Sequence, residues 1–197
     1  MSSMDFFDST LGAVLYWFST VGFAAAALGA AVLTIVLRRN ALIVVSAVLL
    51  AVGLVTVALP TPDPPLVVAL LLGVAAFALA VLGGSPAASF ALDLATHGTV
   101  HPGAFGGIII DRDSPTATAP REVLRGGLAI GYLERAAVAG ALIAGFPEAI
   151  AIVVAIKGVG RFTELAEAET RERFMIGTLA SMVWAAASAG LFVFALH

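Results

Sequence analysis

The sequence predicts an all-α integral membrane protein, a helical bundle of about six transmembrane helices with both termini on the non-cytoplasmic side. Of its 197 residues, 60% are apolar and only 12% are charged, whereas a soluble domain usually carries about 25% charged residues. The apolar residues form runs long enough to cross the ~30 Å hydrocarbon core of a bilayer. A water-soluble protein of this size could not hide so much apolar surface, so lipid is the expected solvent.

The first half, residues 1–84, holds three predicted spans. The first covers 11–37, and the acidic segment before it lacks the basic residues of a cleavable signal peptide. The second covers 41–59 and stops at the proline-rich turn 60–65, because successive prolines cannot continue a helix. The third covers 66–82, and we expect it to end at the Gly83–Gly84 pair.

A polar stretch, residues 85–125, is predicted to be a cytoplasmic loop. Ser85 followed by Pro86 is typical of a helix start, and Gly98 of a helix end. We therefore expect a short helix over 86–97 that lies at the membrane surface. The rest of the loop is rich in Gly, Pro, Ser and Thr, with one β-like run at 108–110.

The second half, residues 126–197, holds predicted spans over 126–146, 148–159 and 174–197. Pro147 marks a sharp turn between the fourth and fifth spans. The fifth is short for a full crossing, so a re-entrant hairpin over 136–156 stays open as an alternative. That alternative places Glu148 in the middle of the bilayer, where a carboxylate is costly.

The basic residues predict the orientation. With the N-terminus outside, nine of the ten Lys and Arg residues fall in inner loops or at the inner end of a span, and the tenth, Arg135, lies deep within a span. This distribution follows the positive-inside rule and predicts a multi-pass protein of a plasma membrane. Three spans precede the inner loop and three follow it, so the halves enter the bilayer from opposite faces, as in many transporters.

Glu134 and Arg135 are the most informative pair, because both are expected about 12 Å inside the bilayer. Ionisable residues there usually pair with one another or face a water-filled cavity. Charges near the inner ends of the last two spans are the expected partners: Lys157 or Arg161 for Glu134, and Glu172 or Glu164 for Arg135. One interpretation is an ion-pair network that locks the last three helices together. The other is a polar site for an ion, a proton or an anionic headgroup.

A basic cluster is expected at the inner face, where each cation near anionic lipid contributes about 1 kcal/mol. It predicts that Arg121, Arg125 and Arg171 bind anionic headgroups of membrane lipids. The alternative is a phosphate pocket that also includes Lys157, Arg161 and Arg173, since guanidinium groups suit phosphate oxygens.

A metal site is a further possibility at Asp93, His97 and His101, which recur every four residues. One carboxylate and two imidazoles form a legitimate ligand set for a divalent cation. Gly98 weighs against it, because a helix that ends there does not hold His101 on the same face. Solvated loop residues are the alternative.

Motifs for other chemistry are absent from the sequence. There is no cysteine, phosphate-binding loop, dinucleotide fingerprint, zinc-protease motif or nucleophile elbow, so no cofactor is expected and an enzyme is the less favoured class. No extended basic domain points to a nucleic-acid partner. Small residues recur at four-residue spacing in the first, fourth and last spans, which favours close helix packing within the chain or in a homo-oligomer or larger membrane complex.

Three spaced motifs in the second half resemble a family of uncharacterised bacterial, largely actinobacterial, integral membrane proteins. They are GGxxIGxLER at 126–135, KxxxRF at 157–162 and ERFxIGTLxS at 172–181. The resemblance covers about residues 125–190 and implies no established activity. It implies that the unit is defined by Glu134, Arg135, Lys157, Arg161, Glu172, Arg173 and Thr178.

Three functions therefore remain open. The first is a small transporter or channel-like protein with Glu134 and Arg135 lining the path. The second is a non-catalytic accessory or assembly subunit of a larger membrane complex. The third is a membrane enzyme that acts on a phosphorylated lipid through the inner basic cluster.

Overall fold

Six α-helices and one pair of two-residue strands make up the computed structural model. It describes residues 3–59, 63–95, 108–109, 122–123, 127–160 and 168–197. The elements, in chain order, are α1 (Ser3–Leu37), α2 (Leu42–Val57), α3 (Leu66–Ala95), β1 (Ile108–Ile109), β2 (Glu122–Val123), α4 (Gly127–Ile143), α5 (Ala149–Gly160) and α6 (Ala168–Ala195). The helical class predicted from the sequence is confirmed. Part of the predicted β-like run forms β1, in which Ile108 pairs with Val123 of β2 in an antiparallel ladder.

Three stretches of helix are long and apolar enough to cross a membrane among the described residues: Thr10–Leu37, Leu66–Ala95 and Arg171–Ala195. They suggest membrane association. The apolar helices α2 and α5 are shorter, with 16 and 12 residues. At 1.5 Å per residue α5 is about 18 Å long, well short of the ~30 Å hydrocarbon core. Six full crossings therefore remain a prediction, and so does the re-entrant alternative for 136–156.

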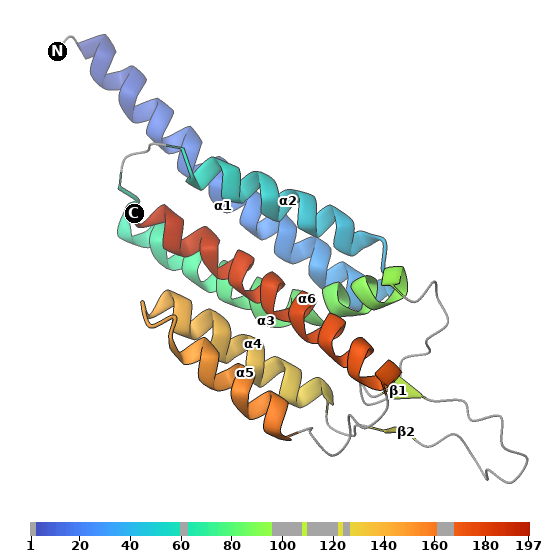
Figure 1. Cartoon of the computed structure of the whole chain (residues 1–197). Coiled ribbons are helices and arrows are strands. Elements are labelled where there is room, and N and C mark those ends of the chain that lie inside the picture. The colour runs from blue at the N-terminus through green and yellow to red at the C-terminus, as the bar shows by residue number, and fades with distance from the viewer. Residues whose placement is uncertain (1–2, 60–62, 96–107, 110–121, 124–126, 161–167) are drawn as a thin grey trace, which may run out of the picture.

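The helices form three layers of antiparallel pairs, α1 with α2, α3 with α6, and α4 with α5 (Figure 1). The central pair has the most extensive contacts, and α1 covers one side of it while α4 covers the other. Successive helices run in opposite directions, so the two termini lie at one end of the bundle, and the α1–α2 turn lies at the other (Figure 1).

The two halves show a partial correspondence. In the first half α1 contacts both α2 and α3, and in the second half α4 contacts both α5 and α6. The correspondence breaks at α4, which also packs on α3, whereas no comparable contact joins α1 to α6 in the described part of the chain. An inverted duplication of the halves stays a prediction.

The helices α1 and α2 are joined by a tight turn and by hydrogen bonds at two positions along their length. Arg38 has φ +52°, a left-handed conformation that is uncommon outside glycine and reverses the chain here. About one turn into α2, Ser46 Oγ donates to the Ala27 carbonyl at 2.7 Å. Near the far end the Tyr16 hydroxyl donates to the Thr56 carbonyl at 2.8 Å. These bonds satisfy side-chain donors that would otherwise face an apolar interior.

The expected end of the third span at Gly83–Gly84 is wrong, and so is the separate helix over 86–97. The helix α3 continues through both glycines and Pro86 to Ala95. Pro86 has no N–H and cannot bond to the carbonyl four residues earlier, yet α3 continues with its flanks packed on other helices. A Cβ on Gly83 would lie 2.4 Å from Trp184 Nε1 of α6, so the glycine makes room for the indole and does not stop the helix.

The last turns of α3 reach the α1–α2 turn (Figure 1). There Asn40 Nδ2 donates to Asp93 Oδ2 at 2.8 Å. Trp184 Nε1, for its part, donates to the Leu79 carbonyl at 3.0 Å and joins α6 to the middle of α3. The helix α3 is thus held along most of its length.

The turn between α4 and α5 is built by backbone hydrogen bonds. Gly145 has φ +72°, its N–H donates to the Leu142 carbonyl, and the Phe146 N–H donates to the Ala141 carbonyl. This bond pattern is the Schellman motif, which needs a residue with positive φ at the position of Gly145. The predicted turn at Pro147 is therefore confirmed, with the reversal made by the glycine two residues earlier.

Candidate functional site: a buried arginine beside an ion pair

Arg135 lies in the middle of α4 and points toward α3 and α6. Only 3% of its surface is exposed, and among the residues whose side chains are described it is the one charged residue that is buried. The arginine also contacts its own helix, since the guanidinium carbon lies 5.0 Å from the centroid of the Tyr132 ring. Such a cation–π contact partly replaces the lost water.

Three hydrogen bonds hold the guanidinium. Nε donates to the Val81 carbonyl at 2.8 Å, and Nη2 donates to Ser85 Oγ at 3.0 Å, both on α3. Nη1 donates to Ser181 Oγ on α6 at 3.1 Å. One side chain therefore joins α3, α4 and α6, and it uses three of its five N–H donors to do so.

Glycine makes this arrangement possible. A Cβ on Gly84 would lie 2.1 Å from Arg135 Cδ, and a Cβ on Gly131 would lie 3.0 Å from Nη1. Real Cβ atoms do not approach other heavy atoms as closely as 2.1 Å. The Gly83–Gly84 pair thus provides the space in α3 that the side chains of Arg135 and Trp184 occupy.

The partners of Arg135 are neutral, which corrects the expected pairing with Glu172. That carboxylate is exposed, and the described bonds of Arg135 go to two hydroxyls and a carbonyl. The physical reason is that a serine on each of two neighbouring helices reaches the guanidinium without carrying a second charge into the interior. The other expected partner, Glu164, lies outside the described residues.

Glu134 pairs with Lys157, as predicted. The carboxylate of α4 and the ammonium of α5 form a salt bridge between side chains that are 11% and 16% exposed. Lys157 Nζ also lies 5.5 Å from the centroid of the Phe174 ring on α6. Because consecutive residues of a helix point about 100° apart, this pair makes no described bond to Arg135, although the Glu134 carboxylate still acts electrostatically on the guanidinium.

The remaining predicted site residues differ in their exposure, where the structure describes them. Thr178 is half-buried one turn before Ser181, Arg173 is half-buried, and Arg171 is exposed. Arg121, Arg125 and Arg161 lie outside the described residues.

Two of the three predicted metal ligands, His97 and His101, also lie outside the described residues. Asp93 is bonded to Asn40. Over the part of the chain that is described, no three carboxylates or imidazoles come close enough to hold an ion.

Sequence reasoning missed the two serines and the glycines that surround Arg135. Ser85 looked like the cap of a new helix, and Ser181 like an ordinary packing residue. A usable signal was present: Gly83, Gly84 and Ser85 place two positions without side chains and one hydroxyl within a single turn of an apolar segment. Such a segment suits a bulky polar side chain from a neighbour.

Comparisons with known proteins add no relative: no family model, no curated protein and no solved structure matches the chain. The resemblance of the second half to a bacterial membrane family thus stays a prediction. What the chain itself offers is a cation held among neutral groups, next to a self-compensated ion pair. Such a centre can attract an anion, or it can fix three helices in one arrangement.

Proposed function

We propose that the chain is a multi-pass protein of a bacterial plasma membrane with six membrane-embedded helices and both termini outside. Charge placement supports this orientation. Apart from Arg135, the described basic residues lie at one end of the bundle, where the α1–α2 turn, the end of α5 and the start of α6 come together (Figure 1). These residues are Arg38, Arg39, Lys157, Arg171 and Arg173. Cations gather on the cytoplasmic side of membrane proteins.

Cysteine labelling tests the orientation, since the chain has no native cysteine. We expect Arg39→Cys to react with a membrane-impermeant maleimide only after the cells are opened. Asp63→Cys, in the α2–α3 turn, is expected to react in intact cells. Labelling of both residues from the same compartment would overturn the proposed arrangement.

For the function, we propose an anion transporter or channel-like protein in which Arg135 is the binding group. The observation that carries the proposal is a guanidinium 3% exposed whose described hydrogen-bond partners are all neutral. A buried charge without a counter-charge is costly, and intramembrane charges that persist usually serve ion or substrate pathways. An anion that binds there restores neutrality.

The neighbouring ion pair supports the same proposal. Lys157 compensates the charge of Glu134, so within the described centre one positive charge is left over. Two N–H donors of Arg135 are not used by its three described bonds. A small anion such as chloride, formate or inorganic phosphate fits that donor set.

Flux through proteoliposomes tests this function. We expect the purified protein to carry at least one of these three anions, and we expect Arg135→Gln to lower that flux about 10- to 100-fold. The estimate follows from losing charge-assisted hydrogen bonds of about 1.5–3 kcal/mol. Arg39→Gln removes an exposed guanidinium and is expected to leave the flux unchanged.

Circular dichroism of the same preparations has to show equal helix content for this comparison to count. Equal flux in the wild type and in Arg135→Gln would contradict the proposal. A wild type that carries none of the anions would contradict it as well.

A second candidate, an accessory subunit of a membrane complex, is favoured by α5. This helix has no buried residue, and the described part of the chain covers it mainly through α4. A partner protein would bury that face. If no anion is carried, a native mass above that of the monomer in the same mildly solubilised preparation would favour this candidate.

A further inference from the structure

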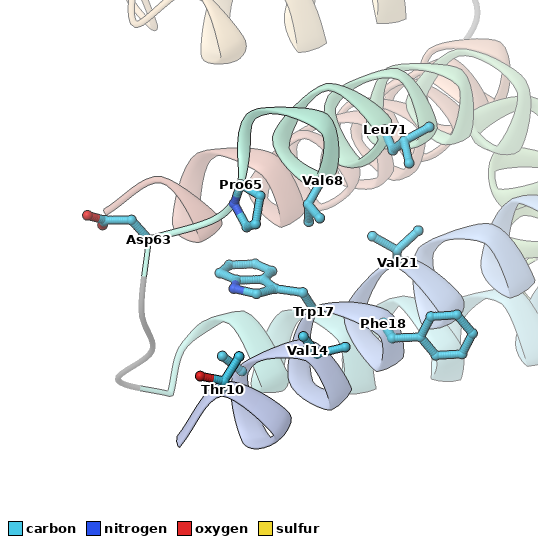
Figure 2. Close-up of a pocket in the computed structure, with 10 residues that line it drawn as sticks. Thr10, Val14, Trp17, Phe18, Val21, Asp63, Pro65, Val68 and Leu71 are labelled. Atoms are coloured by element: carbon cyan, nitrogen blue, oxygen red, sulfur yellow. The ribbon is translucent and has the colours of Figure 1, made fainter. Parts of the chain in front are cut away.

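An apolar cavity lies between α1 and the start of α3 (Figure 2), at the end of the bundle that holds the chain termini (Figure 1). Its volume is about 530 Å³, which is within the range of about 300–1,000 Å³ for small-molecule pockets. Val14 and Phe18 of α1 and Leu71 of α3 line it, and all three are largely exposed. The cavity thus opens sideways, on the surface that faces lipid when these helices span a membrane.

One polar group inside this cavity is unsatisfied. Trp17 lines the cavity and is only 4% exposed, and its Nε1 has no hydrogen-bond partner among the described residues. Figure 2 shows the indole ring between α1 and Pro65, on the cavity side of its helix. A buried indole N–H almost always finds an acceptor, because leaving it unpaired costs about 1–3 kcal/mol.

The other tryptophan provides an internal contrast. Trp184 is buried to a similar degree, at 8% exposure, but its Nε1 is bonded to the Leu79 carbonyl. The chain therefore satisfies one indole donor internally, whereas the other belongs to a residue that lines the apolar cavity and has no described acceptor. A ligand that is otherwise apolar but carries an oxygen acceptor would satisfy it.

The charge of Asp63 restricts the class of ligand further. It lies at the mouth of the cavity, it is exposed, and its carboxylate points away from the Trp17 ring (Figure 2). A carboxylate at the mouth repels a headgroup with net negative charge and attracts an ammonium group. The ligand is therefore expected to be apolar along its length, to carry a neutral oxygen acceptor and to have no net negative charge.

We propose that this cavity binds an acyl chain of a zwitterionic glycerophospholipid, and that Trp17 Nε1 donates a hydrogen bond to the ester carbonyl of that chain. Such a lipid combines the features that the cavity requires: a long apolar chain, a neutral carbonyl at its base and an ammonium group beyond it. It is also the solvent on the open side of the cavity. The proposal depends on the membrane-embedded position of α1 and α3 and not on the anion site at Arg135.

The test compares two phosphatidylethanolamines with identical oleyl-length chains, one linked by esters and the other by ethers. The ether lipid keeps the chains and the headgroup but lacks the carbonyl. We expect the delipidated full chain, measured by native mass spectrometry in detergent, to retain the ester lipid about three- to tenfold more strongly. This is the effect of one hydrogen bond of about 0.5–1.5 kcal/mol.

Three variants test whether the preference for the ester lipid depends on the Trp17 N–H and on the cavity. Trp17→Phe keeps an aromatic ring without the N–H and is expected to abolish the preference for the ester lipid. Trp184→Phe removes an indole whose N–H is already bonded and is expected to keep the preference. Val68→Phe fills the cavity from α3 and is expected to weaken retention of both lipids.

Several results would overturn the proposal. They are equal retention of the two lipids by the wild type, an ester preference that survives in Trp17→Phe, and unchanged retention in Val68→Phe. A dimer that binds no lipid would show that a second copy covers the cavity instead. Thermal unfolding of each variant without added lipid separates lost binding from lost folding.

Discussion

Replacing Lys157 by methionine is expected to lower the free energy of unfolding by about 3 kcal/mol. The change leaves the Glu134 carboxylate, only 11% exposed, without its cation. Removing one partner of a buried ion pair costs about 3–5 kcal/mol, and the lower end applies because both side chains keep some exposure. Unfolding by a denaturing detergent, followed by circular dichroism, measures this difference.

The double variant Glu134→Gln with Lys157→Met is the matched comparison. It removes both charges and is expected to recover most of the lost stability, because no unpaired charge is left in the interior. Arg39→Met, at an exposed position, is expected to change stability by less than about 0.5 kcal/mol. If the single and double variants are equally unstable, packing of the lysine stem and not charge pairing explains the effect.

Gly84→Ala is expected to be comparably harmful, although it adds only one methyl group. The new Cβ would lie 2.1 Å from Arg135 Cδ, so the arginine has to leave its place and give up its bonds to Val81, Ser85 and Ser181. Overpacking costs about 1–3 kcal/mol, and the lost bonds add to it. We expect a loss of about 3 kcal/mol or more in the same unfolding assay.

Two further variants identify the cause. Gly29→Ala adds a methyl group that meets nothing within 4 Å and is expected to be neutral or to stabilise the helix by up to about 1 kcal/mol. Arg135→Ala in the Gly84→Ala background empties the space that the new methyl group needs and is expected to restore part of the stability. If Gly84→Ala alone has the same free energy of unfolding as the wild type, α3 and α4 do not approach each other as closely as described.

The helical class and the Glu134–Lys157 pair were predictable because they follow from local rules. Long apolar runs require lipid or burial, and a carboxylate inside such a run requires a cation at a matching depth. The end of α3 was not predictable in this way. Gly83–Gly84 and Ser85–Pro86 carry correct local signals for a helix end and a helix start, but their partners, Arg135 and Trp184, lie on helices far away in the sequence.

The pairing of Arg135 was mispredicted for a related reason. The prediction from sequence paired each buried charge with an opposite charge, and it therefore assigned a carboxylate to Arg135. A serine is not distinguished by its charge, and only the packing of α3 against α4 and α6 brings Ser85 and Ser181 to one guanidinium. The hydrogen-bond partners of Arg135 are thus the side chains that lie close to it in the folded chain, and not those with the opposite charge.

The three bonds of Arg135 have a mechanical consequence. They originate from one rigid planar group and end on two different helices, so α4 cannot slide along α3 or α6 by half a turn and keep any two of them in good geometry. The α4–α5 pair can therefore move past the central helices only if these bonds break. One guanidinium thus fixes the position of the peripheral helix pair along the axis of the bundle.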